Sequence, residues 1–199
     1  MPARNKDLHG SAPDTCDTAL LLIDVINDLQ FPEANQLLQF ALPMARRLRA
    51  LKQRAYRAGV PSLYINDNFG RWQSNFTTLV DHCLKSRGRD IAKLLLPKRK
   101  DYFVLKPKHS AFYSTTLDVL LRYLGPKRLI ITGIAANICV LFTANDAYMR
   151  DYELLIPSDC VCSNTEEDNE HALQQMKKFL KADIRPSTEL KLSLSKRLR

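Results

Sequence analysis

The segment RLIITGIAANICVLFTANDAYMR, residues 128–150, decides the fold of this chain. Residues 129–131 are branched and apolar, as in a strand that is buried on both faces, and Gly133 ends this run. A short turn follows, and after it apolar side chains recur at helical spacing as far as Tyr148. The pattern predicts a buried strand, a turn and a helix that carries Cys139 on its first turn.

Cys139 stands where this helix begins, and the position favours a reactive thiol. The first turn of a helix presents unpaired N–H groups and a partial positive charge, which stabilise a thiolate and can hold an oxyanion. Free cysteine is also among the residue types that are most often buried in cores. From this segment alone, Cys139 is therefore either a nucleophile or a small core residue.

Strands and helices alternate along the rest of the chain. We expect strands at 18–23, 60–65, 102–105, 129–131 and 152–156, and a sixth from Ile184 and the LKLSL run that begins at Leu190. We expect helices at 37–58, 76–96 with a break near 86–88, 115–124, 140–148 and 165–180. This alternation predicts an α/β fold with a central, mostly parallel, Rossmann-like sheet of about six strands that helices cover on both faces.

Three chemically useful residues stand at the carboxyl ends of these strands. Asp24 follows the first strand, Lys106 the third, and Cys139 the fourth with its turn. Open α/β sheets bind their ligands at this edge. Taken singly, an Asp here caps a turn and a Lys snorkels to solvent, but three such residues on one edge favour a catalytic site. No glycine fingerprint or Walker sequence follows a strand, so nucleotide binding of those kinds is not expected.

Length and charge indicate one domain with polar ends. A chain of 199 residues with 45% hydrophobic content fits a single domain, which we expect at 18–184, between a polar N-terminal arm (1–17) and a basic C-terminal extension (185–199). Residues 177–199 hold eight Lys or Arg against two acidic residues, or +6 of the formal net charge of +9. Since no aromatic residue follows Phe179, nucleic-acid binding is not the favoured function of this extension.

Cysteine usage and hydropathy indicate the compartment. The five cysteines are an odd number, and the sequence begins without the pattern of a signal peptide. Lys or Arg interrupts every long segment, so no membrane span is expected. We therefore expect a reduced, cytoplasmic protein.

Three segments carry a resemblance to a known family: LLLIDVINDLQFP, VLKPKHSAFYSTTLDVLL and ITGIAANICVLFTANDAYMRDYELLIPSDC. In this order and spacing they resemble the isochorismatase-like cysteine hydrolases, which include nicotinamidases, N-carbamoyl amidases and ureidoacrylate-type hydrolases. The resemblance covers residues 19–176. It implies a three-layer α/β/α sandwich that acts on a small molecule and assembles into a dimer or tetramer.

The resemblance also implies roles for particular residues. It places the family's Asp–Lys–Cys triad on Asp24, Lys106 and Cys139, with Asp24 as the base and Lys106 lowering the pKa of the thiol. It places a cis peptide bond between Ile134 and Ala135. The N–H groups of Ala135 and Cys139 would then form an oxyanion hole.

The expected substrate-binding and metal sites follow from loop position and from the resemblance. The residues expected around the substrate are Asn68, Phe69, Trp72, Phe112 and Tyr113. Nicotinamidases carry an Asp/His metal cluster after the second strand, whereas the loop at 66–75 has no histidine. Because Asp67 alone cannot make such a cluster, we expect no metal and no other cofactor. Ala136 stands where many members have threonine, which removes a possible substrate contact.

The favoured function is cleavage of a C–N bond in a small amide or ureido compound through a Cys139 thioester. His109, three residues after Lys106, is a second candidate for the base, although Asp24 already supplies one. Two other functions remain open. One is a metal-free vinyl ether hydrolase in which Asp24 is the acid, and the other is a non-catalytic binding module with this fold.

Overall fold

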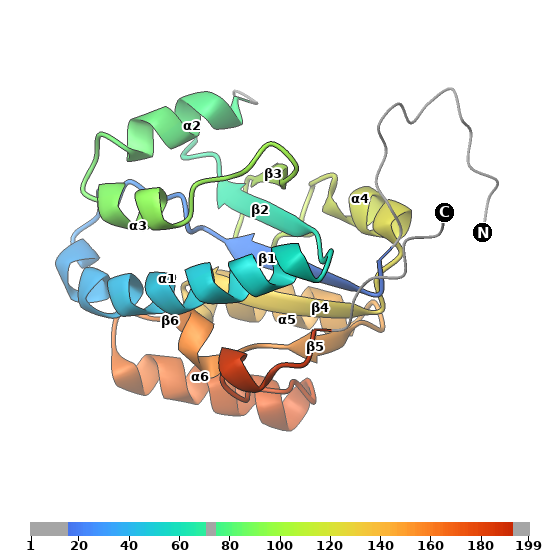
Figure 1. Ribbon diagram of the computed structural model, residues 1–199. Helices are drawn as coiled ribbons and strands as arrows, with labels where there is room; N and C mark the ends of the chain where they lie inside the picture. The colour runs from blue at the N-terminus through green and yellow to red at the C-terminus, as the bar shows by residue number, and fades with distance from the viewer. Residues whose placement is uncertain (1–15, 71–74, 193–199) are drawn as a thin grey trace.

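The structure is a computed structural model that describes residues 16–70 and 75–192, and its centre is a parallel sheet of six strands (Figure 1). The strand order is β3-β2-β1-β4-β5, and β6 pairs with β4 beyond the end of β5. The strands are β1 (Thr18–Ile23), β2 (Ser62–Asp67), β3 (Tyr102–Lys106), β4 (Arg128–Ile134), β5 (Glu153–Leu155) and β6 (Val161–Cys162). The expected α/β fold with a mostly parallel sheet is confirmed, and the sheet is parallel throughout.

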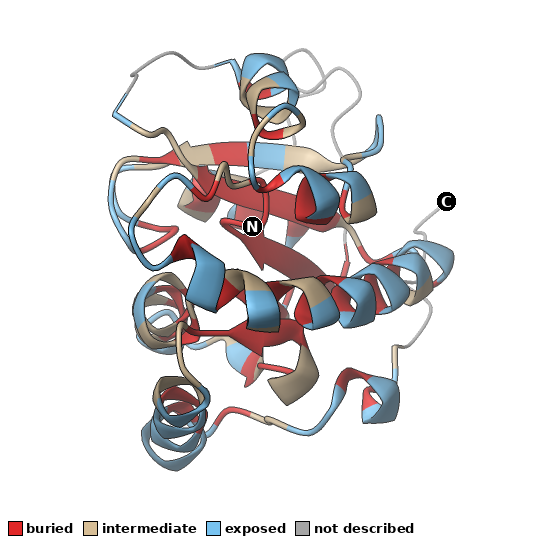
Figure 2. Cartoon of the chain, turned by 90° about the vertical axis from the view of Figure 1, so that its left-hand side faces the viewer, coloured by how far each residue is buried: buried red, intermediate tan, exposed pale blue. Residues whose placement is uncertain are grey.

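Helices cover both faces of this sheet and make a three-layer sandwich (Figures 1 and 2). Apolar residues of α1, α2 and α3 form one hydrophobic cluster with one face of the strands, and those of α4, α5 and α6 form a second cluster with the other face. The helices are α1 (Ala34–Arg57), α2 (Phe76–Cys83), α3 (Arg89–Leu94), α4 (Leu117–Leu124), α5 (Leu141–Tyr148) and α6 (Glu166–Phe179). A π-helix, η2 (Ala136–Val140), leads into α5, and two 3₁₀ turns, η3 (Ser158–Cys160) and η4 (Ser187–Glu189), lie near the C-terminal end.

Several strand predictions differ from the structure. The sixth strand is β6 at 161–162, whereas Asp183 forms only an isolated bridge with Leu155, and Leu190 follows the turn η4. A strand of two residues has no periodicity that a sequence pattern can detect. Strand β4 also continues one residue past Gly133, because its last residues pair with β6.

Strand β2 extends further than predicted, and the extension matters for the site. Its last residues, Asn66 and Asp67, pair with Leu105 and Lys106 of β3. Hydropathy does not indicate a strand here because these residues are polar. Since all strands are parallel, Asp67 and Lys106 meet at the same edge of the sheet as the end of β1.

Gly133 allows β1 and β4 to approach closely at that edge. Its φ is +114°, and a Cβ atom placed on it would collide with the backbone carbonyl of Ile23, its partner in the register. Glycine is therefore required by the backbone conformation and by the contact.

Among the described helices, none is both long and apolar enough to cross a bilayer.

Candidate active site

A buried ion pair lies at the carboxyl edge of the sheet. Lys106, the last residue of β3, places its Nζ 2.8 Å from Oδ2 of Asp24, which directly follows β1. The Lys106 side chain is fully buried and that of Asp24 is 7% exposed. Burying an ammonium is costly unless a carboxylate and further hydrogen bonds compensate it. The Lys106 ammonium also donates to the backbone carbonyl of Lys108 at 3.2 Å.

The local backbone turns Asp24 toward this partner. Asp24 has a φ of +50°, a left-handed conformation that is uncommon outside glycine, and its N–H donates to the carbonyl of Ile65 on β2. Its Oδ1 accepts the N–H of Asp67 at 2.7 Å. Both carboxylate oxygens of Asp24 are therefore engaged, one by Lys106 and one by the end of β2.

Cys139 completes the group from a different element. It lies on η2, directly after β4, and its Sγ is 3.5 Å from Nζ of Lys106. The turn that carries it is held by Ser163, whose hydroxyl donates to Oδ1 of Asn137 at 3.0 Å and accepts the Asn137 N–H at 3.3 Å. The structure thus brings Asp24, Lys106 and Cys139 together, and Lys106 contacts both of the other two.

The electrostatics of this group differ from the sequence prediction in one respect. Burial first, and then the Asp24 carboxylate, raise the pKa of the Cys139 thiol to about 12, whereas Lys106 lowers it by less. Lys106 lowers the pKa of the thiol, as expected, but burial and the Asp24 carboxylate outweigh this effect, so the net shift is upward. The pKa of Cys139 is raised because the thiol is largely removed from water and has a carboxylate close by.

The pKa values of the ion pair are also perturbed. Burial raises the pKa of Asp24, and the attraction of Lys106 and hydrogen bonds with Lys106, Cys139 and the Asp67 N–H only partly oppose it. For Lys106, burial alone would lower the pKa, but Asp24 and then Cys139 raise it more. Asp24 is thus a stronger base than an ordinary aspartate, and Lys106 keeps its proton.

The predicted oxyanion residues lie on the same turn. The peptide bond between Ile134 and Ala135 is cis, as the family resemblance led us to expect. The carbonyl of Ala135 accepts the N–H groups of Ile138 and Val140, and the N–H of Ala135 stands between the end of β4 and the start of η2. The oxyanion role of Ala135 and Cys139 stays a prediction.

The loop after β3 brings a histidine close to Cys139. Nδ1 of His109 lies 3.9 Å from Sγ of Cys139, and the imidazole packs at a tilt against Phe142 of α5, with ring centroids 5.5 Å apart. The side chain of His109 is exposed, whereas Lys106 and Asp24 lie on the buried side of the sulfur. The sequence suggested His109 only as a second candidate for the base.

The residues predicted to surround the substrate lie in different environments. The N–H of Asn68 donates to the carbonyl of Lys106, and the N–H of Phe69 donates to Asp67. Tyr113 is 58% exposed on the loop after His109. Trp72 lies outside the described residues.

Phe112 is placed in the hydrophobic core rather than at an open surface. It is 5% exposed, its ring stacks on Tyr152, and the guanidinium of Arg150 lies 4.5 Å from its ring centroid. This environment gives Phe112 a packing role between β5 and the helices of its face. The position of Phe112 in a loop next to Tyr113 does not indicate that its side chain is buried.

Asp67 is a site residue that the sequence analysis considered only as an insufficient metal ligand. Its Oδ2 lies 4.0 Å from Nζ of Lys106, and its side chain is 41% exposed. Asp67 ends β2 as Asp24 follows β1, so the same strand-end argument could have identified it. In the described part of the chain, no cluster of three or more His, Cys, Asp and Glu side chains is arranged to hold a metal ion.

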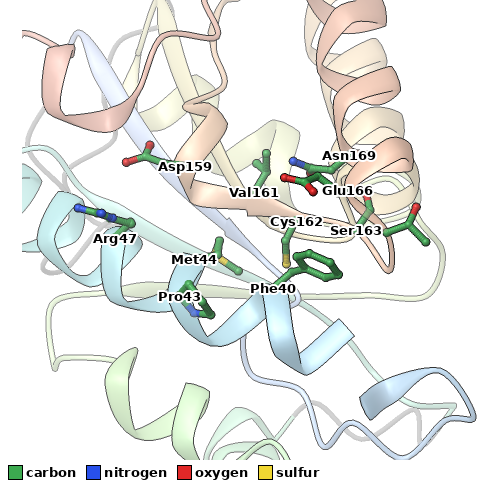
Figure 3. Close-up of a pocket in the computed structure, with 11 residues that line it drawn as sticks. Phe40, Pro43, Met44, Arg47, Asp159, Val161, Cys162, Ser163, Glu166 and Asn169 are labelled. Atoms are coloured by element: carbon green, nitrogen blue, oxygen red, sulfur yellow. The ribbon is translucent and has the colours of Figure 1, made fainter. Parts of the chain in front are cut away.

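A separate cavity of about 260 Å³ lies between α1, β6 and the start of α6 (Figure 3). Phe40 and Met44 of α1 form one wall, and Cys162 and Ser163 form another. Ser163 links this cavity to the turn that carries Cys139, since this serine holds Asn137. None of Asp24, Lys106 and Cys139 lines this cavity.

Comparisons with known proteins agree with the fold. The isochorismatase domain family matches residues 18–184. The uncharacterized isochorismatase family protein YaaI of Bacillus subtilis (strain 168) is 46% identical over 168 residues, which cover 84% of this chain and 93% of that protein. The ureidoacrylate amidohydrolase RutB of Methylobacterium radiotolerans is 27% identical over 186 residues, covering 80% of this chain and 71% of RutB.

A solved structure has the same fold. The N-carbamoylsarcosine amidase of Thermoplasma acidophilum superposes with a TM-score of 0.66 at 24% identity, and the match covers 88% of this chain and 99% of that one. At this identity the likeness concerns the arrangement of strands and helices.

Proposed function

Because the chain belongs to the isochorismatase family of hydrolases, we propose that it cleaves a C–N bond of a small amide or ureido compound, with Cys139 as nucleophile, Asp24 as base and Lys106 between them. One observation carries this proposal. In the buried edge of the sheet, a single ammonium contacts both a carboxylate with a raised pKa and a thiol. Perturbed groups in mutual contact at a ligand-binding edge are typical of catalytic sites.

The raised thiol pKa defines how the attack begins. Since Cys139 carries its proton in the free enzyme at neutral pH, the proton must leave as the sulfur attacks the substrate carbonyl. Asp24 is the base that accepts it, because burial makes this carboxylate more basic than usual. Lys106 offsets the negative charge that moves between the carboxylate and the sulfur.

The rest of the reaction follows from the same turn. The N–H groups of Ala135 and Cys139 stabilise the carbonyl oxygen as it becomes negative, an effect typically worth about 3 kcal/mol per donor. The C–N bond then breaks, the leaving nitrogen receives a proton, and the acyl group stays on Cys139 as a thioester. Attack by water releases the acid and returns the proton to the thiol.

The relatives support this chemistry without naming the substrate. RutB is described as a ureidoacrylate amidohydrolase and the Thermoplasma protein as an N-carbamoylsarcosine amidase, so hydrolysis of C–N bonds occurs with this fold. Asn68 and Phe69 follow Asp67 at this edge of the sheet, and we propose that they contact the substrate. We propose a small substrate with an amide or ureido group.

The test is ammonia release over a panel of small amides and ureido compounds, measured for the wild type and for Cys139→Ala, with and without a chelator. Release that needs Cys139 and ignores the chelator supports the proposal. Release that survives Cys139→Ala contradicts the nucleophile. Pyruvate release from isochorismate that also survives this substitution identifies a vinyl ether hydrolase, with Asp24 as acid, in its place.

A further inference from the structure

We propose that His109 gives a proton to the leaving nitrogen of the substrate and later takes one from the attacking water. This inference rests on the function proposed above and adds a fourth catalytic residue to it. The starting observation is the 3.9 Å distance between Nδ1 of His109 and Sγ of Cys139. A group this close to the nucleophile also reaches the atoms that are bonded to the carbon under attack.

The position of His109 complements that of the ion pair. Lys106 and Asp24 approach the sulfur from the interior, where their side chains are 0% and 7% exposed. His109 approaches it from the solvent-exposed side, which is where a substrate must enter. The two proton carriers therefore lie on different sides of the reacting atom.

The histidine is held in place by α5, the helix that continues from the turn carrying Cys139. The hydroxyl of Ser110 donates to Asp146 of α5. The N–H of Ala111 donates to Oγ1 of Thr143, which in turn donates to the backbone carbonyl of Cys139. With the Phe142 ring against the imidazole, these contacts fix the distance between His109 and the sulfur.

The Asp24 carboxylate, which also hydrogen-bonds with the Cys139 thiol, lies on the interior side of the sulfur. One oxygen of Asp24 faces Lys106 and the other accepts the Asp67 N–H, so a proton taken from the thiol stays on the interior side. An amine leaves as a neutral molecule only if it gains a proton. A protonated imidazole donates from both ring nitrogens and can supply that proton from the open side.

The proton balance closes over one turnover. In acylation, the thiol proton passes to Asp24, the C–N bond breaks, the C–S bond forms, and the His109 imidazolium protonates the leaving nitrogen. In deacylation, the neutral imidazole of His109 takes a proton from water as its oxygen bonds to the acyl carbon. The C–S bond breaks, and Asp24 returns its proton to the sulfur, so the enzyme regains its starting state.

A pair of substrates with the same acyl group isolates the protonation of the leaving group. 4-Nitrophenyl acetate and 4-nitroacetanilide both transfer an acetyl group, but nitrophenolate leaves without a proton whereas the anilide nitrogen needs one. The variants are His109→Gln, which keeps a hydrogen-bonding side chain that does not titrate, and the control His171→Gln, an exposed histidine on α6. Acetylation of Cys139 and product release are measured for each.

We expect His109→Gln to lower the rate of Cys139 acetylation by the anilide about 100-fold and to leave the rate of acetylation by the ester unchanged, because general acids contribute about 10²- to 10⁴-fold. Hydrolysis of the acetyl-enzyme should slow equally for both substrates, because His109 also takes the proton of the attacking water. His171→Gln should change neither rate. An equal fall in the acetylation rate for both substrates would show that His109 only supports the structure, and no fall in that rate for either would show that Asp24 supplies the proton. Acetylation of wild-type Cys139 by the ester without anilide cleavage would likewise overturn the donor role.

The same experiment separates this inference from the proposed function. If the ester fails to acetylate Cys139 in the wild type, the nucleophile assignment fails, and the role of His109 fails with it. If the ester acetylates Cys139 and only the His109 result is negative, the nucleophile stands and the donor is wrong.

Discussion

Replacing Asp24 by Asn should make Cys139 more reactive toward iodoacetamide while it abolishes hydrolysis. In the free enzyme the Asp24 carboxylate raises the pKa of the thiol, and only burial contributes more to the value of about 12. Asparagine removes the charge but keeps an oxygen that can accept the Asp67 N–H. The substitution therefore favours the thiolate and removes the base at the same time.

The magnitude follows from the contacts of Lys106. Because its Nζ lies 2.8 Å from Asp24 and 3.5 Å from Cys139, the carboxylate and the sulfur are at most about 6 Å apart, and two unit charges at that distance interact by about 3 kcal/mol at an effective dielectric constant of about 20. An effect of that size corresponds to about two pKa units. With partial compensation by relaxation, we expect the thiolate fraction at pH 8 to rise about 10- to 100-fold.

The direction of the change in the pKa of Cys139 does not depend on the charge of Lys106 in the variant. An unpaired buried lysine tends to lose its proton, which would remove its lowering effect on the thiol. However, the Asp24 effect on the pKa of Cys139 is larger than that of Lys106. Loss of both charges therefore still lowers the pKa.

The assay is the second-order rate of carboxymethylation of Cys139 between pH 7 and 9, followed by mass spectrometry of its peptide. Cys139→Ser gives the background from the other four cysteines, all of which are buried. Asp67→Asn is the matched control, because that carboxylate is 41% exposed and its charge is screened by water. Alkylation of Asp24→Asn that is as slow as in the wild type, or slower, would refute this electrostatic account and show that Asp24 activates the thiol before substrate binds.

Three further outcomes are expected. Since Asp24 must be ionised and its pKa is raised, kcat/KM should fall as pH decreases with a midpoint above 3.8, and a midpoint at or below 3.8 would contradict the assignment. Gly133→Ala should destabilise the fold by more than about 2 kcal/mol in urea unfolding, whereas Gly125→Ala, with open space at its Cβ position, should cost about 1 kcal/mol. Lys52→Met should cost about 3–5 kcal/mol in the same assay, because Asp101, 2.6 Å away and 6% exposed, is left as an unpaired buried charge.

The accuracy of the sequence predictions depended on the type of signal. The strand at 18–23 and the break between α2 and α3 were predicted correctly, since apolar runs and turn residues mark them locally. β6 was missed because its two residues pair only through the register of β4. Phe112 was expected near the substrate but is buried against Tyr152, because burial depends on which elements pack together.

The sequence by itself determined the alternation of strands and helices and the positions of Asp24, Lys106 and Cys139 at strand ends, because apolar periodicity and turn chemistry are local properties of the chain. Only the tertiary structure decided the distances among them, the approach of His109 and the sign of the thiol pKa shift. These quantities are sums of burial and charge over residues far apart in sequence. A pattern of residue types does not contain them.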